Sequence, residues 1–221
     1  MMPAWRIEHL DGDDVGAFHA RPLGDQRSAT FFTARSPTLV AGSSQRDESI
    51  DTAAAAQRGI GVVRRRSGGG GVLLLPDEHV WLDLEIPASD ALWNDDVGRA
   101  TWWVGELWRA ALAPFAPSAT VHTGRMQRTR WSDDICFAGV GPGEVLVAGA
   151  KLVGISQRRT RLAARFQTMV HLRWRPEVVA ALVADLPSGR PDADELAPLA
   201  ATCSATAGEI TTQLLAMLDD L

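Results

Sequence analysis

Short apolar runs alternate with polar turns along much of the chain, a pattern that is typical of β-strands joined by tight connections. Two of these runs lie on either side of Pro76-Asp77-Glu78, and we expect them to pair as the two arms of a hairpin. The runs that predict strands are Ala29–Thr33, Thr38–Ala41, Gly61–Arg65, Val72–Leu75, Val80–Ile86, Ile135–Ala138, Glu144–Ala148, Lys151–Ile155 and Ala164–Trp174.

Longer segments place their apolar residues at helical spacing. The clearest runs from Asp96 to Ala113, where Val104, Leu107 and Trp108 fall on one face. The other predicted helices are Asp47–Arg58, Pro176–Asp185 and Ser204–Leu218, while residues 1–27 predict an irregular lead-in with one short element and 187–194 a loop.

Strands outnumber helices and cluster into hairpins, which favours an α+β fold. We predict a largely antiparallel mixed sheet flanked by helices. A chain of 221 residues is long enough to bury one good-sized core. We assign residues 1–186 to the main domain and residues 187–221 to a C-terminal helical tail.

Composition narrows the cellular setting. Hydrophobic residues make up 46% and charged residues 22% of the chain, and no apolar run is long enough to cross a bilayer. A net charge of -5 argues against general binding to nucleic acid. The N-terminus lacks the pattern of a signal peptide, and the only cysteines are Cys136 and Cys203. These features predict a cytoplasmic protein that does not associate with membranes.

One residue stands apart in the composition. Of 22 basic residues, Lys151 is the only lysine and all the others are arginines. Arginine can replace lysine on a surface, but not where a compact ammonium or an amine with an adjustable pKa is needed. Retention of Lys151 therefore indicates a functional role, although chance survival of a surface lysine is the alternative that composition alone leaves open.

A glycine-rich segment lies between two predicted strands and follows three arginines. Glycine runs suit places where a ligand approaches the main chain, and successive backbone N–H groups can bind an anion. A flexible hairpin loop is the structural alternative. The segment is neither a P-loop nor a dinucleotide-binding motif, because it lacks a following Lys-Ser/Thr and the Gly-x-Gly-x-x-Gly spacing. It consists of Arg64-Arg65-Arg66-Ser67-Gly68-Gly69-Gly70-Gly71-Val72.

Lys151 begins a second segment of interest, at the start of an apolar strand just after a glycine turn. Gly154 lies inside that strand, which indicates another close approach to the backbone. The basic side chains of the two segments together favour an anionic ligand. The second segment reads Gly149-Ala150-Lys151-Leu152-Val153-Gly154-Ile155-Ser156-Gln157-Arg158-Arg159.

These motifs, in this order, resemble those of the lipoate–protein ligase family, which includes octanoyltransferases and is related to biotin–protein ligases. The glycine segment fits Arg-Arg-x-Ser-Gly-Gly-Gly-x-Val and the lysine segment fits Gly-x-Lys-x-x-Gly-x-x-Gln. The resemblance covers about residues 28–175. It also includes Ala41-Gly42-Ser43-Ser44-Gln45, which is similar to a turn that closes over the ligand. The chain departs from the usual pattern at Gly71, Leu74-Leu75 and Ile155-Ser156.

The resemblance implies a fold like the core of a class II synthetase and gives roles to particular residues. Lys151 matches the lysine that contacts the acyl carbonyl and the phosphate, where a fixed ammonium stabilises developing negative charge. The other residues that the resemblance places at the substrate or nucleotide are Gln45, Arg65, Ser67, Gly68, Gly69, Gly70, Gly71, Val72, Leu73, Gly154, Ser156 and Gln157.

The activity implied is attachment of lipoate or octanoate to a lysine of a lipoyl carrier domain. In the ligase version, ATP and Mg²⁺ convert the acid to an acyl adenylate. The implied carriers are the lipoyl domains of 2-oxoacid dehydrogenases or the glycine cleavage H protein. Known ligases also need an accessory domain, which a separate chain would have to supply here.

Two alternatives remain open at this level. The stretch Ile135-Cys136-Phe137-Ala138, followed by Glu144 and Lys151, is similar to one branch of octanoyltransferases, in which a Cys-Phe pair precedes the lysine turn. There, acyl carrier protein would deliver octanoate to the Cys136 thiolate, with no ATP or other cofactor. The structural alternative is a buried, inert cysteine. A family member that binds an acyl ligand without catalysis is the other possibility. The histidines show no metal-ligand spacing, so no metal site is predicted.

Overall fold

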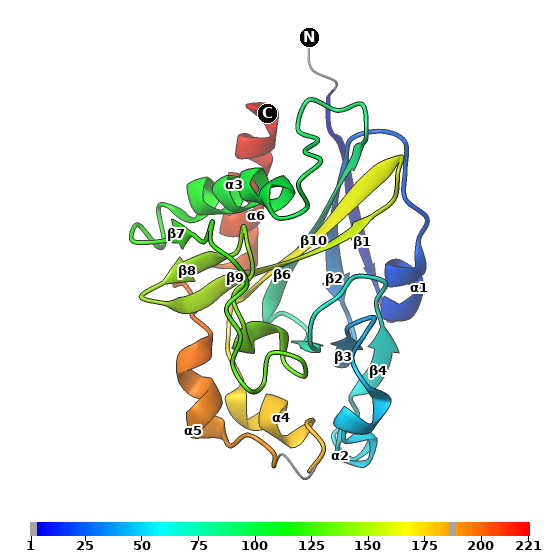
Figure 1. Cartoon of the computed structure of the whole chain (residues 1–221), viewed down its shortest axis with the longest axis vertical. Coiled ribbons are helices and arrows are strands. Elements are labelled where there is room, and N and C mark those ends of the chain that lie inside the picture. Colours follow the sequence, from blue (N-terminus) through cyan, green and yellow to red (C-terminus); the bar gives the residue numbers. More distant parts are fainter. Residues whose placement is uncertain (1–3, 186–188) are drawn as a thin grey trace.

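The computed structural model describes residues 4–185 and 189–221, which build two β-sheets with helices around them (Figure 1). The large sheet has the strand order β1-β2-β6-β10-β9-β8-β7, and the small sheet has the order β4-β3-β5. The strands are β1 (Arg6–Gly12), β2 (Ser28–Ala34), β3 (Thr38–Ala41), β4 (Gly61–Arg64), β5 (Val72–Leu74), β6 (His79–Pro87), β7 (Thr120–Val121), β8 (Val145–Val147), β9 (Ala150–Arg159) and β10 (Ala163–His171).

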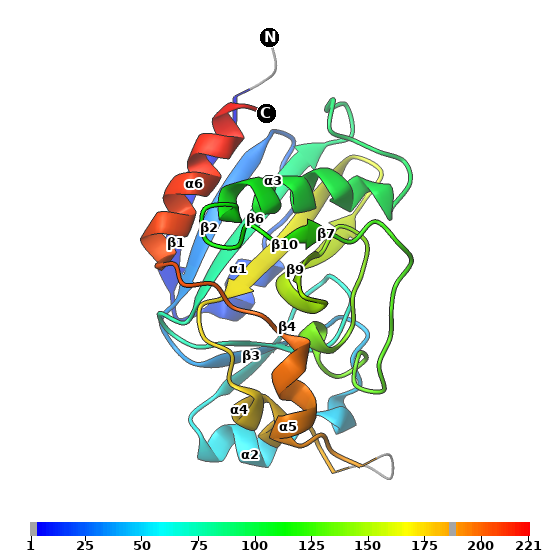
Figure 2. The ribbon, with the colours of Figure 1, turned by 90° about the vertical axis from the view of Figure 1, so that its left-hand side faces the viewer.

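The helices cover the large sheet and one end of the molecule. Figure 2 shows α3 and α6 lying across one face of the large sheet, and Figure 1 shows α2, α4 and α5 gathered near the small sheet, at the end away from both termini. The helices are α1 (Val15–Ala20), α2 (Thr52–Gln57), α3 (Trp102–Leu112), α4 (Pro176–Ala181), α5 (Ala193–Leu196) and α6 (Ala207–Asp219).

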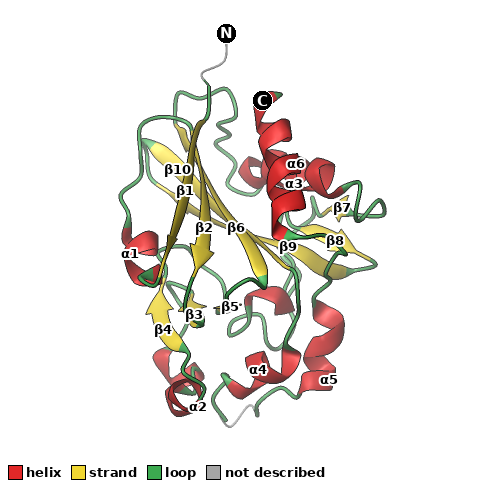
Figure 3. Cartoon of the chain, turned by 180° about the vertical axis from the view of Figure 1, so that it is seen from behind, coloured by secondary structure: helices red, strands yellow, loops and turns green. Residues whose placement is uncertain are grey.

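The sheet is largely antiparallel, and the predicted α+β class is confirmed. Strands β2, β6, β10 and β9 pair antiparallel, whereas β1 runs parallel to β2 at the edge (Figure 3). No helix in the described ranges 4–185 and 189–221 combines the length and apolar character needed to cross a bilayer.

The two faces of the large sheet differ in chemistry because successive side chains of a strand point to opposite faces. On the face under α3 and α6, Leu82 and Leu84 of β6 join Trp108 and Phe166 in a fully buried apolar core. The opposite face carries buried polar side chains, which must find partners within the protein. They include Asp83, Glu85, Arg165 and Gln167.

The C-terminal helix belongs to the same core. Ile210, Leu214 and Leu218 of α6 are at most 1% exposed and pack in the cluster beneath α3. Before this helix, the Ala201 N–H donates to the Lys151 carbonyl at 2.8 Å. The proposed boundary between residues 186 and 187 lies outside the described residues, as do the first two residues of the predicted 187–194 loop.

Two predictions about strands were wrong. Val72–Leu75 and Val80–Ile86 do not form a hairpin, because β5 pairs with β3 in the small sheet and β6 pairs with β2 and β10. The positive φ of 60° at Asp77 turns the chain from one sheet into the other. Ile135–Ala138 is not a strand, since Cys136–Ala138 form a 3₁₀ turn.

The N-terminal lead-in, predicted to be irregular, contains the edge strand β1 as well as α1. Most side chains of β1 are exposed, so it lacks the alternating apolar pattern from which the other strands were predicted.

Stability should fall in mild acid because His171 is buried among aromatic rings. Its ring lies 4.5 Å from Phe137 and 5.1 Å from Trp174, centroid to centroid. Burial, and after it the neighbouring His79, lower the pKa of His171 from 6.5 to about 3. The folded state thus keeps His171 neutral while the unfolded chain takes up a proton below about pH 6.5. This contribution to stability is complete above that pH and is lost progressively as the pH falls towards 3.

Because of His171, we expect the free energy of unfolding to fall by about 2 kcal/mol between pH 7 and pH 5. Urea denaturation at both pH values would measure it. In His171→Phe this component of the pH dependence should be absent. Equal pH slopes in His171→Phe and the wild type would contradict the expectation.

Candidate active site

The glycine segment forms a loop between β4 and β5 that Arg65 holds from inside. Arg65 is 2% exposed, and its guanidinium donates to the carbonyls of Val40 at 3.0 Å, Gly68 at 2.7 Å and Gly70 at 2.9 Å. These bonds fix the curvature of the loop. The resemblance placed Arg65 at a bound nucleotide, and in this structure it organises the backbone that would meet one.

Ser67 and Gln45 tie the loop to its surroundings. The Ser67 hydroxyl donates to Gln167 Oε1 at 2.7 Å and lies 3.0 Å from the Ser156 hydroxyl, so the loop is fastened to β9 and β10. Gln45 Nε2 donates to the Asp134 carbonyl at 3.1 Å, and the Gly71 N–H donates to the same carbonyl at 2.9 Å. The turn at Gln45 and the glycine loop therefore meet on the segment that precedes Cys136.

Lys151 lies at the base of the site and is 2% exposed. Its Nζ donates to the Cys136 carbonyl at 2.6 Å and to Glu144 Oε1 at 2.8 Å. The Glu144 carboxylate also accepts the backbone N–H groups of Gly141 at 2.6 Å and Ile155 at 3.1 Å. A buried ammonium is thus paired, as a buried charge requires, and its position is fixed by two anchored oxygens.

Glu144 was not among the predicted site residues. It lies seven residues before Lys151, immediately before β8, and the antiparallel pairing of β8 with β9 brings the two together. The sequence offered a signal, a lone carboxylate in an apolar strand next to the lysine strand, but spacing alone does not specify the pairing register.

Cys136 lies against the end of the glycine loop. Its N–H donates to the Gly71 carbonyl at 2.9 Å, and a Cβ at Gly154 would lie 3.8 Å from its Sγ. Burial lowers the pKa of Arg65, and the charge and hydrogen bonding of the neighbouring Cys136 act in the opposite direction. Cys203 lies elsewhere, in the core under α6, where burial raises the pKa of its thiol.

Two hollows open around these residues. The wider one has a volume of about 380 Å³, and Cys136, Glu144 and Lys151 form part of its wall together with Gly68–Gly70. The narrower one, beneath Cys136, has a volume of about 10 Å³ and is lined by Arg65, Val72 and Gly154 among others. Cys136, Ile155 and Ser156 line both, so the two hollows adjoin.

Most predicted site residues therefore come together. Ser156 and Gln157 complete the wall of the wide pocket, and both amide atoms of Gln157 are buried without a hydrogen-bond partner in the described part of the chain. Leu73 instead packs in the apolar cluster of the small sheet with Leu39. A Cβ at Gly71 would meet Leu39 and Gln45, and Gly71 lines neither hollow.

Positive charge collects beside the loop. Desolvation, then the charge of Arg66, then that of Arg165 lower the pKa of Arg158, and its buried Nη1 has no partner among the described residues. An anion here would relieve the repulsion between these guanidinium groups. Within the same described ranges, no group of three or more His, Cys, Asp or Glu side chains could hold a metal ion.

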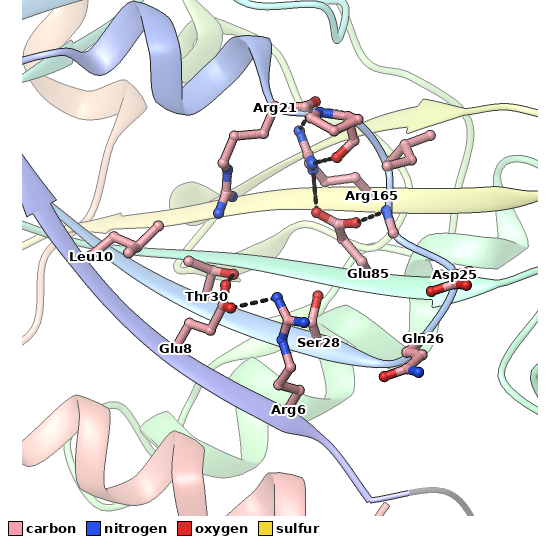
Figure 4. Close-up of a pocket in the computed structure, with 13 residues that line it drawn as sticks. Arg6, Glu8, Leu10, Arg21, Asp25, Gln26, Ser28, Thr30, Glu85 and Arg165 are labelled. Atoms are coloured by element: carbon pink, nitrogen blue, oxygen red, sulfur yellow. Dashed lines mark hydrogen bonds and ion pairs between the residues drawn. The ribbon is translucent and has the colours of Figure 1, made fainter.

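A further hollow of about 490 Å³ lies on the polar face of the large sheet (Figure 4). Its charged side chains bind one another: Arg165 Nε donates to Glu85 Oε1 at 2.7 Å, and Glu85 accepts the Gly24 N–H at 2.7 Å. Beneath it, burial raises the pKa of Asp83 to about 6, and the Arg165 charge opposes that shift. These groups satisfy each other and stabilise the sheet face beside the site.

One pocket on the mixed sheet is enclosed by the glycine loop and by a buried, paired lysine. A domain with such a pocket is suited to handling an activated carboxyl group. The sequence matches the model of the lipoyl protein ligase A/B catalytic domain over residues 15–183. The chain therefore belongs to this family of ligase- or transferase-type enzymes, and the resemblance carried by its motifs is confirmed.

Solved structures show the same fold at low sequence identity. A bi-partite lipoate protein ligase from Thermoplasma acidophilum matches with a TM-score of 0.73 and 14% identity, covering 100% of this chain and 84% of that one. A lipoate-protein ligase A bound with ATP matches with a TM-score of 0.67 and 14% identity, covering 100% and 85%. A P. falciparum protein in complex with lipoate gives a TM-score of 0.65 and 10% identity, covering 98% and 62%. No curated protein matches the sequence.

Proposed function

We propose that this chain is a lipoate–protein ligase, which attaches lipoate or octanoate to a lysine of a lipoyl carrier domain through an acyl adenylate. The observation that carries the proposal is the chain's only lysine, buried at the base of a pocket whose other wall is the glycine loop. Two fixed oxygens hold its Nζ, so the ammonium is preorganised for the charge that develops on an acyl carbonyl.

In this reaction the acid's carboxylate attacks the α-phosphorus of ATP and releases pyrophosphate. The carrier's lysine amine then attacks the acyl carbonyl, and AMP leaves with the bonding electron pair while the amine loses its proton. The N–H groups of Gly68–Gly70 and the cations Arg66 and Arg158 suit the phosphate. Mg²⁺ would be held mainly through the phosphates and water, which needs few protein ligands. A related structure with bound ATP supports this version.

The position of Cys136 favours a second candidate, an octanoyltransferase that uses no ATP. Cys136 lines both hollows, and its thiol neighbours Arg65. Its thiolate would attack the thioester of octanoyl-acyl carrier protein, and the carrier phosphopantetheine thiolate would leave. The lysine amine of the lipoyl domain would then attack the octanoyl thioester on Cys136, and the Cys136 thiol would be restored.

For partners, we propose the lipoyl domains of 2-oxoacid dehydrogenases or the glycine cleavage H protein, encountered in the cytoplasm. The Thermoplasma acidophilum relative is described as a bi-partite ligase, and its E2 lipoyl domain is named with it. This supports both a lipoyl-domain acceptor and a separate accessory chain for the present protein.

A mass spectrum of a purified lipoyl domain after incubation with this protein tests the proposal. One reaction contains lipoate, ATP and Mg²⁺, and the other contains octanoyl-acyl carrier protein without ATP. We expect the acyl mass in the first. An acyl mass in the second alone, lost in Cys136→Ser, would establish the transferase instead. Modification in neither, with or without an accessory chain, would contradict both.

A further inference from the structure

The narrow cavity beneath Cys136 is the apolar continuation of the site. The wide pocket is walled by glycines and polar groups, among them Thr101, Ser132 and Glu144. The narrow cavity has five apolar side chains in its wall, four of them from the two sheets and one from the 3₁₀ turn after Ile135. They are Val72, Trp81, Ile155 and Met169 from the sheets and Phe137 from the turn, and Arg65, Ser156 and Gln167 complete the wall beside Cys136 and Gly154.

This cavity adjoins the place where the reacting carbonyl would lie, so it suits an acyl chain. The reacting carbonyl must lie beside Lys151 and Cys136, and the residues shared by the two hollows are found at that point. Methylene groups favour apolar surroundings, at about 0.8 kcal/mol for each one buried. A polar nucleotide suits the wide pocket and an apolar chain suits the narrow one.

In this structure the indole of Trp81 forms part of the wall of this cavity. The volume of the cavity is about 10 Å³, which is roughly the space one water molecule needs. Trp81 is 3% exposed, its Nε1 donates to Asp83 Oδ1 at 2.7 Å, and its ring meets that of His19 edge-on at 5.1 Å. Gln167, held by Ser67, lies beside it in the same wall.

We propose that Trp81 determines the length of acyl chain that the site accepts. This rests on the acyl transfer proposed above. Short carboxylates such as acetate and butanoate fit beside Lys151 with the indole in place. Octanoate and lipoate enter only when the indole leaves the cavity and gives up its bond to Asp83.

Calorimetric titration with acetate, butanoate, hexanoate and octanoate tests this in the full chain. In the wild type, we expect affinity to stop rising beyond butanoate. In Trp81→Leu, each further methylene should be buried and raise affinity by about fourfold, so the four methylenes that separate octanoate from butanoate should increase the affinity ratio by about 10²-fold. Catalysis is not needed for this readout.

Trp108→Leu is the matched control. Trp108 is also a buried tryptophan, and its Nε1 donates to Thr168 at 2.8 Å, but it lies on the opposite face of the same sheet. Its replacement likewise removes a buried indole and one hydrogen bond, and it should leave the affinity ratio unchanged. If near-ultraviolet circular dichroism shows that Trp81→Leu does not fold, Trp81→Phe should raise the ratio by a smaller factor.

An unchanged ratio in the folded Trp81 variant would overturn the proposal, as would wild-type affinity that rises steadily to octanoate. Either result would leave acyl transfer itself standing. If none of the proteins bound any carboxylate, with or without ATP, the proposed ligase activity would be wrong, and with it the role of Trp81 in that activity.

Discussion

Replacing Lys151 with methionine is expected to abolish acyl transfer and to destabilise the fold at the same time. The ammonium is the cation fixed at the base of the site, and loss of one preorganised charge or donor at a developing oxyanion costs about 10²–10³ in rate. The same change leaves the Glu144 carboxylate buried without its cation. Breaking a buried pair in this way costs about 3–5 kcal/mol of unfolding free energy.

A second variant separates the two effects. In Lys151→Met combined with Glu144→Gln, the buried charge is gone, and the amide oxygen can still accept the N–H groups of Gly141 and Ile155. We expect urea denaturation to show most of the lost stability restored, while the mass spectrum of the carrier domain shows no modification. Return of acyl transfer in the double variant would mean that Lys151 serves folding alone.

Arginine at position 151 provides a stricter test. The site holds Nζ at 2.6 Å from one oxygen and 2.8 Å from another, so a larger planar guanidinium cannot take the same place. Full transfer by Lys151→Arg would remove the explanation for why this one lysine persists in an arginine-rich chain.

The sequence was most informative where the chemistry allows few residue types. A single lysine and a run of glycines are costly or improbable unless a site requires them, so Lys151 and residues 68–70 could be predicted. The roles of Arg65 and Glu144 could not, because both depend on which backbone groups lie nearby after folding. Trp81 gave no signal either, since its neighbours in the cavity come from both sheets.

The errors in the predicted fold have a common physical origin. Alternation of apolar and polar residues indicates that a strand has a buried face, but it does not indicate which sheet the strand joins. For this reason β5 and β6 were paired wrongly. The strand β1 was missed because an exposed edge strand has little apolar periodicity to detect. Cys136 was placed on a strand because three apolar neighbours in a row also suit a tight buried turn.

Gly70→Ala is expected to reduce acyl transfer strongly, whereas Gly71→Ala should be tolerated. A Cβ at Gly70 would lie 2.4 Å from the Ile135 nitrogen and 2.7 Å from the Asp134 carbonyl carbon, both backbone atoms that cannot turn away. A Cβ at Gly71 would meet Leu39 Cδ1 at 3.1 Å and Gln45 Oε1 at 3.2 Å, both atoms at the ends of side chains, and its backbone neighbour, the Asp134 oxygen, would lie at 3.4 Å, an ordinary contact distance. The two adjacent glycines thus differ in the atoms that an added methyl group would meet first, which are backbone atoms at Gly70 and side-chain atoms at Gly71.

The methyl group at position 70 would have to push the loop away from the segment that carries Cys136, and overpacking of this kind costs about 1–3 kcal/mol. The Cys136 carbonyl also anchors Lys151, so the displacement reaches the ammonium directly. A shift of about 1 Å in a reacting group can cost 10²-fold in rate. We therefore expect carrier acylation to fall by about 10²-fold in Gly70→Ala while the variant still unfolds cooperatively in urea. Equal activities in the two alanine variants would show that the close contact between the glycine loop and the Cys136 segment is not needed to position Lys151.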